Sequence, residues 1–373
     1  MLILIVFACA TKVQSNTTPA YDISNPSAQN YLQSHADYAT DLWSRTAKAA
    51  KALDQTIQAF QNTPSPETLS AAKKQWLETR TLYSQTESLR FQNGPIDNPD
   101  TGVEGFLNAW PLDESYVDYT SEDPNAGIIN NVEQYPEINR SLLLSLNERG
   151  GEENISTGFH AIEFILWGQD MSTEAPGNRP VTDFTEHPQA SRRLAYLQLS
   201  SKLLVQHLEE VHTAWTDSYR KTYTAKNPQE IFTGIWTGMA MLTGDEMAGE
   251  RMAVPYETKD QEDEQSCFSD STLQDFQNNL VGIHNQYHGY EGKVGLRSII
   301  QEHDSNMDEK ITRSLQEAID AVNNIPHPFD QSIQNEEHRP KVEIAITKLE
   351  DLSDVLVAGA SSMGIRVLLE GGS

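Results

Sequence analysis

The chain has 373 residues, of which 54 are acidic and 27 are basic, and its formal net charge is −27. A surface of that sign repels nucleic acid and anionic lipid and attracts cations, so we exclude nucleic-acid binding as the function. The length suits two ordinary domains. An acidic surface also keeps many proteins soluble, so the charge alone does not make a cation the ligand.

Residues 1–9 form an apolar run that ends at Cys9. The run is too short to span a bilayer, but it has the length of a signal-peptide hydrophobic region. Residues 6–9 are similar to the lipobox of bacterial lipoproteins, in which the cysteine is lipidated. We therefore expect export to the periplasm or outer membrane, with a lipid anchor on the membrane at Cys9. An ordinary secretory signal is the alternative, and residues 10–29 are expected to be a flexible linker.

Apolar residues recur at helical spacing along most of the chain, and no segment shows the alternation of a half-buried strand. The clearest stripes cover residues 42–60, 69–83, 194–215 and 342–356. This pattern predicts an all-α fold.

The two ends of the chain share one plan, in which two helices flank a turn of the form Asn-x-Pro-x-Pro. Such turns occur at residues 62–66 and 324–328. Proline disfavours helix in the residue before it, so both turns should separate helices. We predict two internally repeated helical bundles packed together, with residues 30–227 in the first half and 228–373 in the second.

His160 and Glu163 stand three residues apart in a segment that is otherwise apolar enough to be buried. At that spacing the two side chains share one face of a helix. A buried carboxylate without a partner costs several kcal/mol or takes up a proton. Glu163 therefore needs a hydrogen-bond network, a cation or a metal ion.

Two other predicted helices carry charged residues on faces that begin as apolar stripes. Glu87 and Arg90 follow one stripe, and Glu246 and Glu250 follow another with Arg251 beside them. Carboxylates four residues apart repel each other by roughly a few tenths of a kcal/mol unless a cation lies between them. Exposed salt bridges would explain the charged residues of either helix alone. Carboxylates on apolar faces of three predicted helices favour a functional site.

Residues 158–164 resemble the Gly-x-His-x-x-Glu signature of the imelysin family. Residues 90–97, 179–184, 242–251 and 267–270 are similar to the iron-regulated protein A branch of that family. The resemblance implies two repeated helical bundles, export, production under iron limitation, and a role in iron uptake beside other iron-uptake proteins. Members of the family were first classed as metallopeptidases.

We interpret the chain as an exported protein that binds a metal ion or iron species where its two halves meet. Imidazole and carboxylates suit iron, zinc or manganese. The expected metal ligands or ligand organisers are His160, Glu163, Glu87, Asp97, Asp245, Glu246 and Glu250. The expected charge partners are Arg90 and Arg251.

Two alternatives stay open. The first is a metallopeptidase that holds zinc with His160 and Glu163, although the sequence has no His-Glu-x-x-His motif and shows no third ligand beside this pair. The second is a buried structural network in a protein whose partner is haem or another protein.

Overall fold

The computed structural model describes residues 20–369. Residues 1–9, with the predicted lipid anchor at Cys9, and the first half of the predicted linker lie outside this range. The first helix begins at Pro26, so the last four residues of the predicted linker 10–29 are helical. No helix in the described range combines the length and the apolar character needed to cross a membrane.

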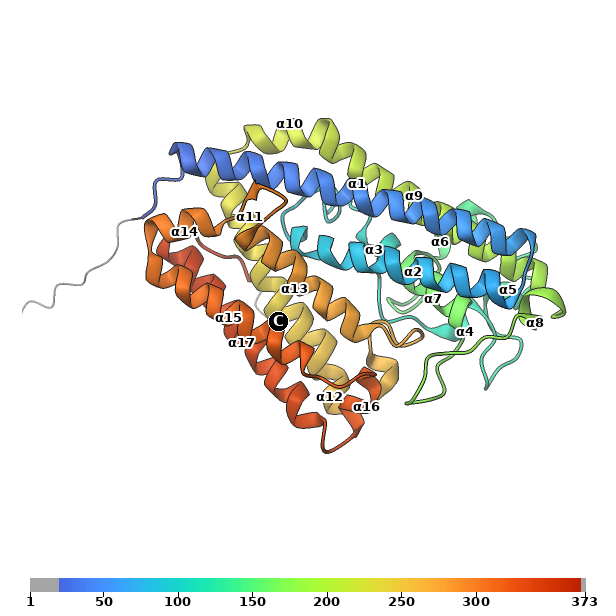
Figure 1. Ribbon diagram of the computed structural model, residues 1–373. Coiled ribbons are helices and arrows are strands. Elements are labelled where there is room, and N and C mark those ends of the chain that lie inside the picture. The colour runs from blue at the N-terminus through green and yellow to red at the C-terminus, as the bar shows by residue number, and fades with distance from the viewer. Residues whose placement is uncertain (1–19, 370–373) are drawn as a thin grey trace, which may run out of the picture.

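The described residues are mostly helical, which confirms the predicted fold class at that level (Figure 1). A hairpin of two short antiparallel strands, β1 (Gly289–Tyr290) and β2 (Lys293–Val294), is the sheet found in this range. The longer helices are α1 (Pro26–Asn62), α2 (Pro66–Thr86), α7 (Gly158–Trp167), α9 (Ala190–Thr216), α10 (Ser218–Ala225), α11 (Pro228–Met241), α13 (Thr272–His288), α15 (Ser305–Asn323) and α17 (Arg339–Ser362). Shorter helical segments are η1 (Glu87–Leu89), α3 (Glu104–Leu107), α4 (Glu114–Val117), α5 (Gly127–Asn130), α6 (Arg140–Leu146), α8 (Thr182–Thr185), η2 (Leu242–Ala253), α12 (Val254–Thr258), η3 (Gln261–Asp263), α14 (Arg297–His303) and α16 (Phe329–Gln334).

The longer helices pack in two groups. In the first group α1 packs against α2 and α9, and α7 packs against both α2 and α9. In the second group α17 packs against α11, η2 and α15. Helix α13 contacts α2 of the first group and α15 of the second, as its place between them in Figure 1 shows. The division into repeated halves stays a prediction. Because α13 packs against both groups, it brings residues from distant parts of the chain to one site.

Both proline turns separate helices, in two different ways. At the first turn Ser65 and Thr68 form a reciprocal capping box, with Pro66 in the first turn of α2. The second turn is longer than the matching motif suggested, because α16 lies between α15 and α17. Both helix pairs are therefore separated at a proline turn, but the segments that link the two helices differ.

Helix α7 carries the His160 and Glu163 pair and is buried along its whole length. Its first residue, Gly158, has a φ of +89°, and a Cβ there would lie 2.6 Å from the carbonyl oxygen of Leu107. Glycine is the residue that adopts such a φ without strain and leaves room for this close approach. Gly158 therefore allows α7 to begin in close contact with α3.

Helix α11 continues as η2, a π-helical segment that begins at Leu242. In an α-helix Glu246 and Glu250 would follow the face of the buried Trp236 and Met239. A π-helix turns less per residue, so the face drifts. Glu246 is half-buried, Glu250 is exposed and Arg251 is buried. The predicted single face is therefore split, because the sequence spacing assumed an α-helix.

Candidate functional site

His160 and Glu163 lie fully inside the protein and contact each other. His160 Nδ1 is 2.9 Å from Glu163 Oε2. The other oxygen, Glu163 Oε1, accepts hydrogen bonds from the backbone N–H of Ser269 at 3.0 Å and from its hydroxyl at 2.6 Å. The loop before α13 therefore supplies the partner that the sequence required for Glu163.

Burial controls the charge of this pair. It raises the pKa of Glu163 to about 8, against the opposing effect of the Ser269 hydrogen bonds. Burial also lowers the pKa of His160 well below its usual value, and Arg80 and Arg251 lower it further. Both shifts favour the neutral forms near pH 7, and in that state a Glu163 hydroxyl would donate to Nδ1.

His160 Nε2 is buried and has no hydrogen-bond partner within the described residues. When Glu163 is protonated, Nε2 carries the imidazole hydrogen. Loss of the Glu163 proton would move that hydrogen to Nδ1 and free the Nε2 lone pair for a metal ion. The pair could thus supply one nitrogen ligand, but both Glu163 oxygens are already engaged and two guanidiniums disfavour a cation nearby. His160 and Glu163 do not make a ligand shell by themselves.

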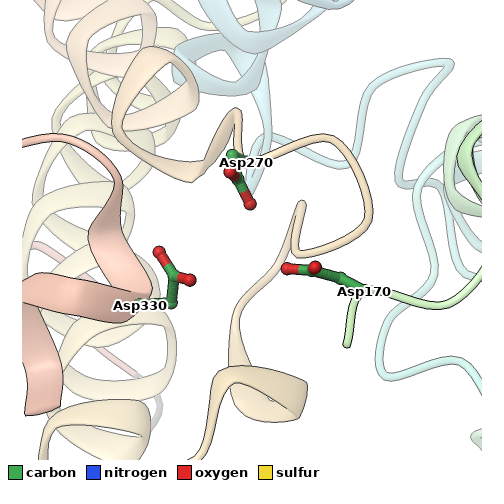
Figure 2. A group of neighbouring side chains, drawn as sticks. All are labelled: Asp170, Asp270 and Asp330. Carbon is green, nitrogen blue, oxygen red and sulfur yellow. The ribbon is translucent and has the colours of Figure 1, made fainter. Parts of the chain in front are cut away.

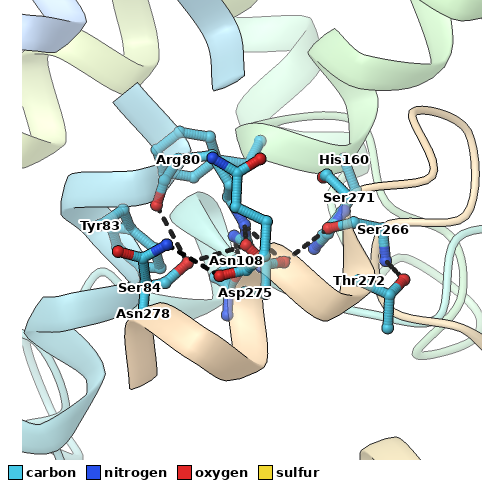
Figure 3. A network of polar contacts seen from close by, with 12 residues as sticks. Arg80, Tyr83, Ser84, Asn108, His160, Ser266, Ser271, Thr272, Asp275 and Asn278 are labelled. Atoms are coloured by element: carbon cyan, nitrogen blue, oxygen red, sulfur yellow. Dashed lines mark hydrogen bonds and ion pairs between the residues drawn. The ribbon is translucent and has the colours of Figure 1, made fainter. Parts of the chain in front are cut away.

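A buried ionic network lies beside the pair and joins α2 to α13 (Figure 3). Arg80 Nε is 3.0 Å from both carboxylate oxygens of Asp275. The hydroxyls of Ser84 and Ser266 donate to the same carboxylate at 2.8 and 2.7 Å. Arg80 also donates to the amide oxygen of Asn108. This network was not predicted from the sequence, although Arg80 is a charged residue that interrupts the apolar stripe of α2.

A second ionic cluster joins the end of α2 to η2. Arg251 lies 2.6 Å from Glu87 and also donates to Glu246. Arg90 is 3.5 Å from both Glu104 and Glu246 and 4.0 Å from Glu87. Burial acts to raise the pKa of Glu246, but Arg251 and Arg90 outweigh it and hold that pKa below its usual value. Glu246 is therefore ionised at neutral pH.

An open cleft of about 500 Å³ borders this cluster. Trp110 lines the cleft and also contacts His160, with 4.8 Å between the ring centroids. His160 is only 1% exposed and therefore lies behind the cleft wall. The acidic lining consists of Glu104, Glu148, Glu152, Glu246, Glu250 and Asp263, and the basic lining consists of Arg90 and Arg251.

Two of the predicted ligands lie away from this cleft. The Asp97 carboxylate accepts hydrogen bonds from the backbone N–H groups of Gln92 and Gly94, and it lines a different cavity beside α11. Asp245 is exposed and is not part of the cleft lining. Of the predicted residues, Glu246, Glu250, Arg90 and Arg251 line the cleft, Glu87 lies behind Arg251, and His160 and Glu163 lie behind Trp110.

Three further carboxylates could hold a metal ion, and none of them was predicted as a ligand from the sequence. Asp170, Asp270 and Asp330 each offer an oxygen, and these oxygens lie within 4.8 Å of one another (Figure 2). The three residues are separated by 100 and 60 positions and come from a loop, a turn and the start of α16. No local spacing pattern could have joined them.

Comparison with known proteins agrees with the motif. Residues 34–356 match the family model for imelysin. Iron-regulated protein A of Synechococcus elongatus is 26% identical over 317 residues, which are 83% of this chain and 79% of that protein.

Two solved structures share the fold. An iron-regulated protein A precursor from Parabacteroides distasonis has a TM-score of 0.73 at 19% identity, covering 92% of this chain and 98% of that one. An imelysin-like protein from Psychrobacter arcticum has a TM-score of 0.68 at 14% identity, covering 94% and 99%. The family match spans most of the sequence and includes the Gly158, His160 and Glu163 motif, so this chain belongs to the imelysin family.

Proposed function

We propose that this chain is an exported protein of iron acquisition that binds a metal ion or a cationic iron species in the cleft beside Trp110. The observation that carries the proposal is the charge of the cleft, where six carboxylates face two guanidiniums. A cleft lined by one sign of charge raises the local concentration of the opposite ion. A cation is therefore the ligand class that this cleft favours.

The two guanidiniums do not neutralise the cleft, because they are already paired. Arg90 and Arg251 form ion pairs with Glu87, Glu104 and Glu246. The remaining lining carboxylates form no ion pair with the described residues: Glu148, Glu152, Glu250 and Asp263. Burial raises the pKa of Glu148, and Glu104 and Glu152 raise it further, as expected for carboxylates that repel one another. A cation would relieve that repulsion.

The role in iron acquisition rests on a relative. The Synechococcus elongatus protein is named iron-regulated protein A, and the similarity extends over most of both chains. Carboxylates with one imidazole nearby suit iron, manganese or zinc. In this proposal the unpaired cleft carboxylates hold the cation, while His160 and Glu163 organise the wall behind Trp110.

Export is part of the same proposal. The Parabacteroides distasonis protein is described as a precursor, and residues 1–9 of this chain resemble a signal segment. We propose a location in the periplasm or at the outer membrane, with lipid on Cys9. Mass spectrometry of the native N-terminus tests this, and an unmodified terminus downstream of Cys9 would leave export intact but remove the anchor.

A metallopeptidase is the second candidate, and the site gives it less support. A zinc hydrolase needs about three protein ligands and an open position for water. His160 is 1% exposed and Glu163 is not exposed at all, so a peptide carbonyl has no direct access to them. A structural role for the network, with haem or a protein as the partner, is the third candidate.

Calorimetry of chelator-treated protein with Fe²⁺ under anaerobic conditions, and with Mn²⁺ and Zn²⁺, tests the proposal. We expect saturable binding that weakens at least tenfold when Glu148→Gln and Glu250→Gln are combined. Glu309→Gln, at an exposed glutamate on α15, is the matched control and should leave the affinity unchanged. Absence of saturable binding, or an unaffected double variant, would overturn the proposal. Metal-dependent cleavage of insulin chains that is lost in both His160→Ala and Glu163→Ala would favour the peptidase.

A further inference from the structure

A second group of carboxylates lies away from the cleft, where three separate segments meet. Asp170 follows α7, Asp270 lies in the turn before α13, and Asp330 is in the first turn of α16. All three are buried, with exposed fractions of 3%, 7% and 2%. Figure 2 shows the three carboxylates pointing toward a common centre.

Two unpartnered side chains mark this centre as a place for a ligand. Neither carboxylate oxygen of Asp330 has a hydrogen-bond partner, and Figure 2 shows them turned toward Asp270. Glu264 is also 2% exposed, and its Oε1 atom has no partner. Asp170, Asp270 and Asp330 all act on its pKa, so Glu264 belongs to the same acidic region.

These four carboxylates form no ion pair with any lysine or arginine in residues 20–369. Buried carboxylates without a counter-ion must take up protons or bind a cation. Burial raises the pKa of Asp270 to about 8 and those of Asp170 and Asp330 to about 6. Protons and a metal ion would therefore compete for the same oxygens.

The donor atoms indicate the class of metal, and their spacing is compatible with it. All donors are carboxylate oxygens, which suit the hard cations calcium, magnesium and manganese. Calcium binds oxygen at about 2.3–2.6 Å, so oxygens on opposite sides of one ion are about 4.6–5.2 Å apart. The oxygens of the three aspartates lie within 4.8 Å of one another. Calcium also accepts irregular geometry and water ligands, as a site built from loops requires.

We propose that Asp170, Asp270 and Asp330, with Glu264 beside them, form an oxygen-only calcium site that fastens the loop after α7 to the starts of α13 and α16. Ser269 precedes Asp270 and donates hydrogen bonds from its backbone N–H and its hydroxyl to Glu163. An ion at Asp270 would therefore hold the turn that also positions Glu163. The site shares no residue with the cleft lining, so either site can exist without the other.

Calcium titration of chelator-treated full-length protein at pH 7.5, followed by calorimetry and thermal unfolding, tests this site. We expect one ion per chain and a rise of several degrees in the unfolding midpoint. Asp270→Asn and Asp330→Asn should each weaken binding at least tenfold and remove the calcium-dependent part of that rise. Asp354→Asn, at an exposed position on α17, is the control and should bind calcium as the wild type does.

Two results would overturn the calcium site. One is wild-type protein that shows no saturable uptake of calcium, and in that case the carboxylates share protons. The other is binding that persists unchanged in Asp330→Asn. Loss of Fe²⁺ binding in the cleft variants with calcium binding intact would separate the two sites and support this one.

Discussion

The guanidinium of Arg251 in η2 lies 2.6 Å from the carboxylate of Glu87 in η1, directly after α2. Both side chains are buried, with exposed fractions of 6% and 0%. The pair joins two segments that are more than 150 residues apart in the chain. Arg90 and Glu246 extend this network to the wall of the cleft, so the same contacts hold the cleft lining and the packing of the helices.

Removal of Arg251 should therefore be strongly destabilising. Arg251→Ala leaves Glu87 buried with only the more distant Arg90 as a partner, and breaking a buried ion pair costs about 3–5 kcal/mol. We expect a fall in the free energy of unfolding near the lower end of that range, measured by urea denaturation. Lys348→Ala removes solvent-screened ion pairs with Glu317 and Asp351 and should cost much less. Equal costs for the two variants would contradict the structural role of Arg251.

The second prediction concerns Gly158, the first residue of the helix that carries His160. Gly158→Ala places a methyl group 2.6 Å from the Leu107 carbonyl oxygen, at a φ of +89°. Gly292 is the matched control, since its φ of +78° is similar but a Cβ there meets nothing within 4 Å. Gly292→Ala should cost about 1 kcal/mol from backbone conformation alone, and Gly158→Ala clearly more. Urea denaturation of both variants measures the difference.

The helical fold was predictable from the sequence, because apolar residues at helical spacing report which faces are buried. The ends of α15 and α17 and the turn before α2 lie close to where the prolines and apolar stripes placed them. The π-helical form of η2 was not predictable from that spacing, since the pattern assumes an α-helical period. The contact of α13 with α2 was also hidden, because it depends on packing between distant segments.

Some residues of the candidate site were likewise predictable from the sequence, and others were not. The His160 and Glu163 pair was predictable because both residues lie on one short helix. Ser269 and Asp275 were missed because their roles depend on contacts with residues more than 100 positions away. Asp97 was expected at the site for its chemistry, but its oxygens are used by the local backbone. The residue type shows what chemistry a side chain can perform, but only the fold determines which side chains lie close together.

His35 gives a prediction for the pH dependence of stability. The imidazole is buried between Tyr223, whose hydroxyl lies 2.7 Å from Nδ1, and Gln286, whose amide oxygen lies 3.0 Å from Nε2. Burial lowers its pKa to about 4, against the opposing effect of the Gln286 hydrogen bond. The unfolded chain, with a pKa near 6.5, therefore binds the proton first as the pH falls.

The free energy of unfolding should thus be lost progressively as the pH falls from about 6.5 to about 4. The part due to His35 is on the order of 3 kcal/mol, from a pKa difference of about two and a half units. Denaturation of the wild type and of His35→Gln at half-unit pH steps measures it. The variant should lose less stability over this range than the wild type, and parallel curves would contradict the assignment.

Glu163 gives the last prediction, which depends on its protonation state. As a neutral acid that donates to His160 Nδ1 and accepts from Ser269, Glu163 has the hydrogen-bonding pattern of a glutamine. Glu163→Gln should then cost less than about 1.5 kcal/mol. Glu163→Ala removes the partner of two buried residues and leaves a cavity, so it should cost about 3 kcal/mol or more.

Urea denaturation of both variants at pH 7, with Glu309→Ala as the exposed control, decides between the protonation states. If Glu163 is instead ionised, Nδ1 of His160 carries a hydrogen that would face the donor side of the new amide. The amide would then force that hydrogen onto Nε2 and replace a charged acceptor of the Ser269 hydrogen bonds by a neutral one, so Glu163→Gln should cost more than about 1.5 kcal/mol. That result would show that a carboxylate, and not a carboxylic acid, stands beside His160, and it would leave the Nε2 lone pair free for a metal ion without any loss of a proton.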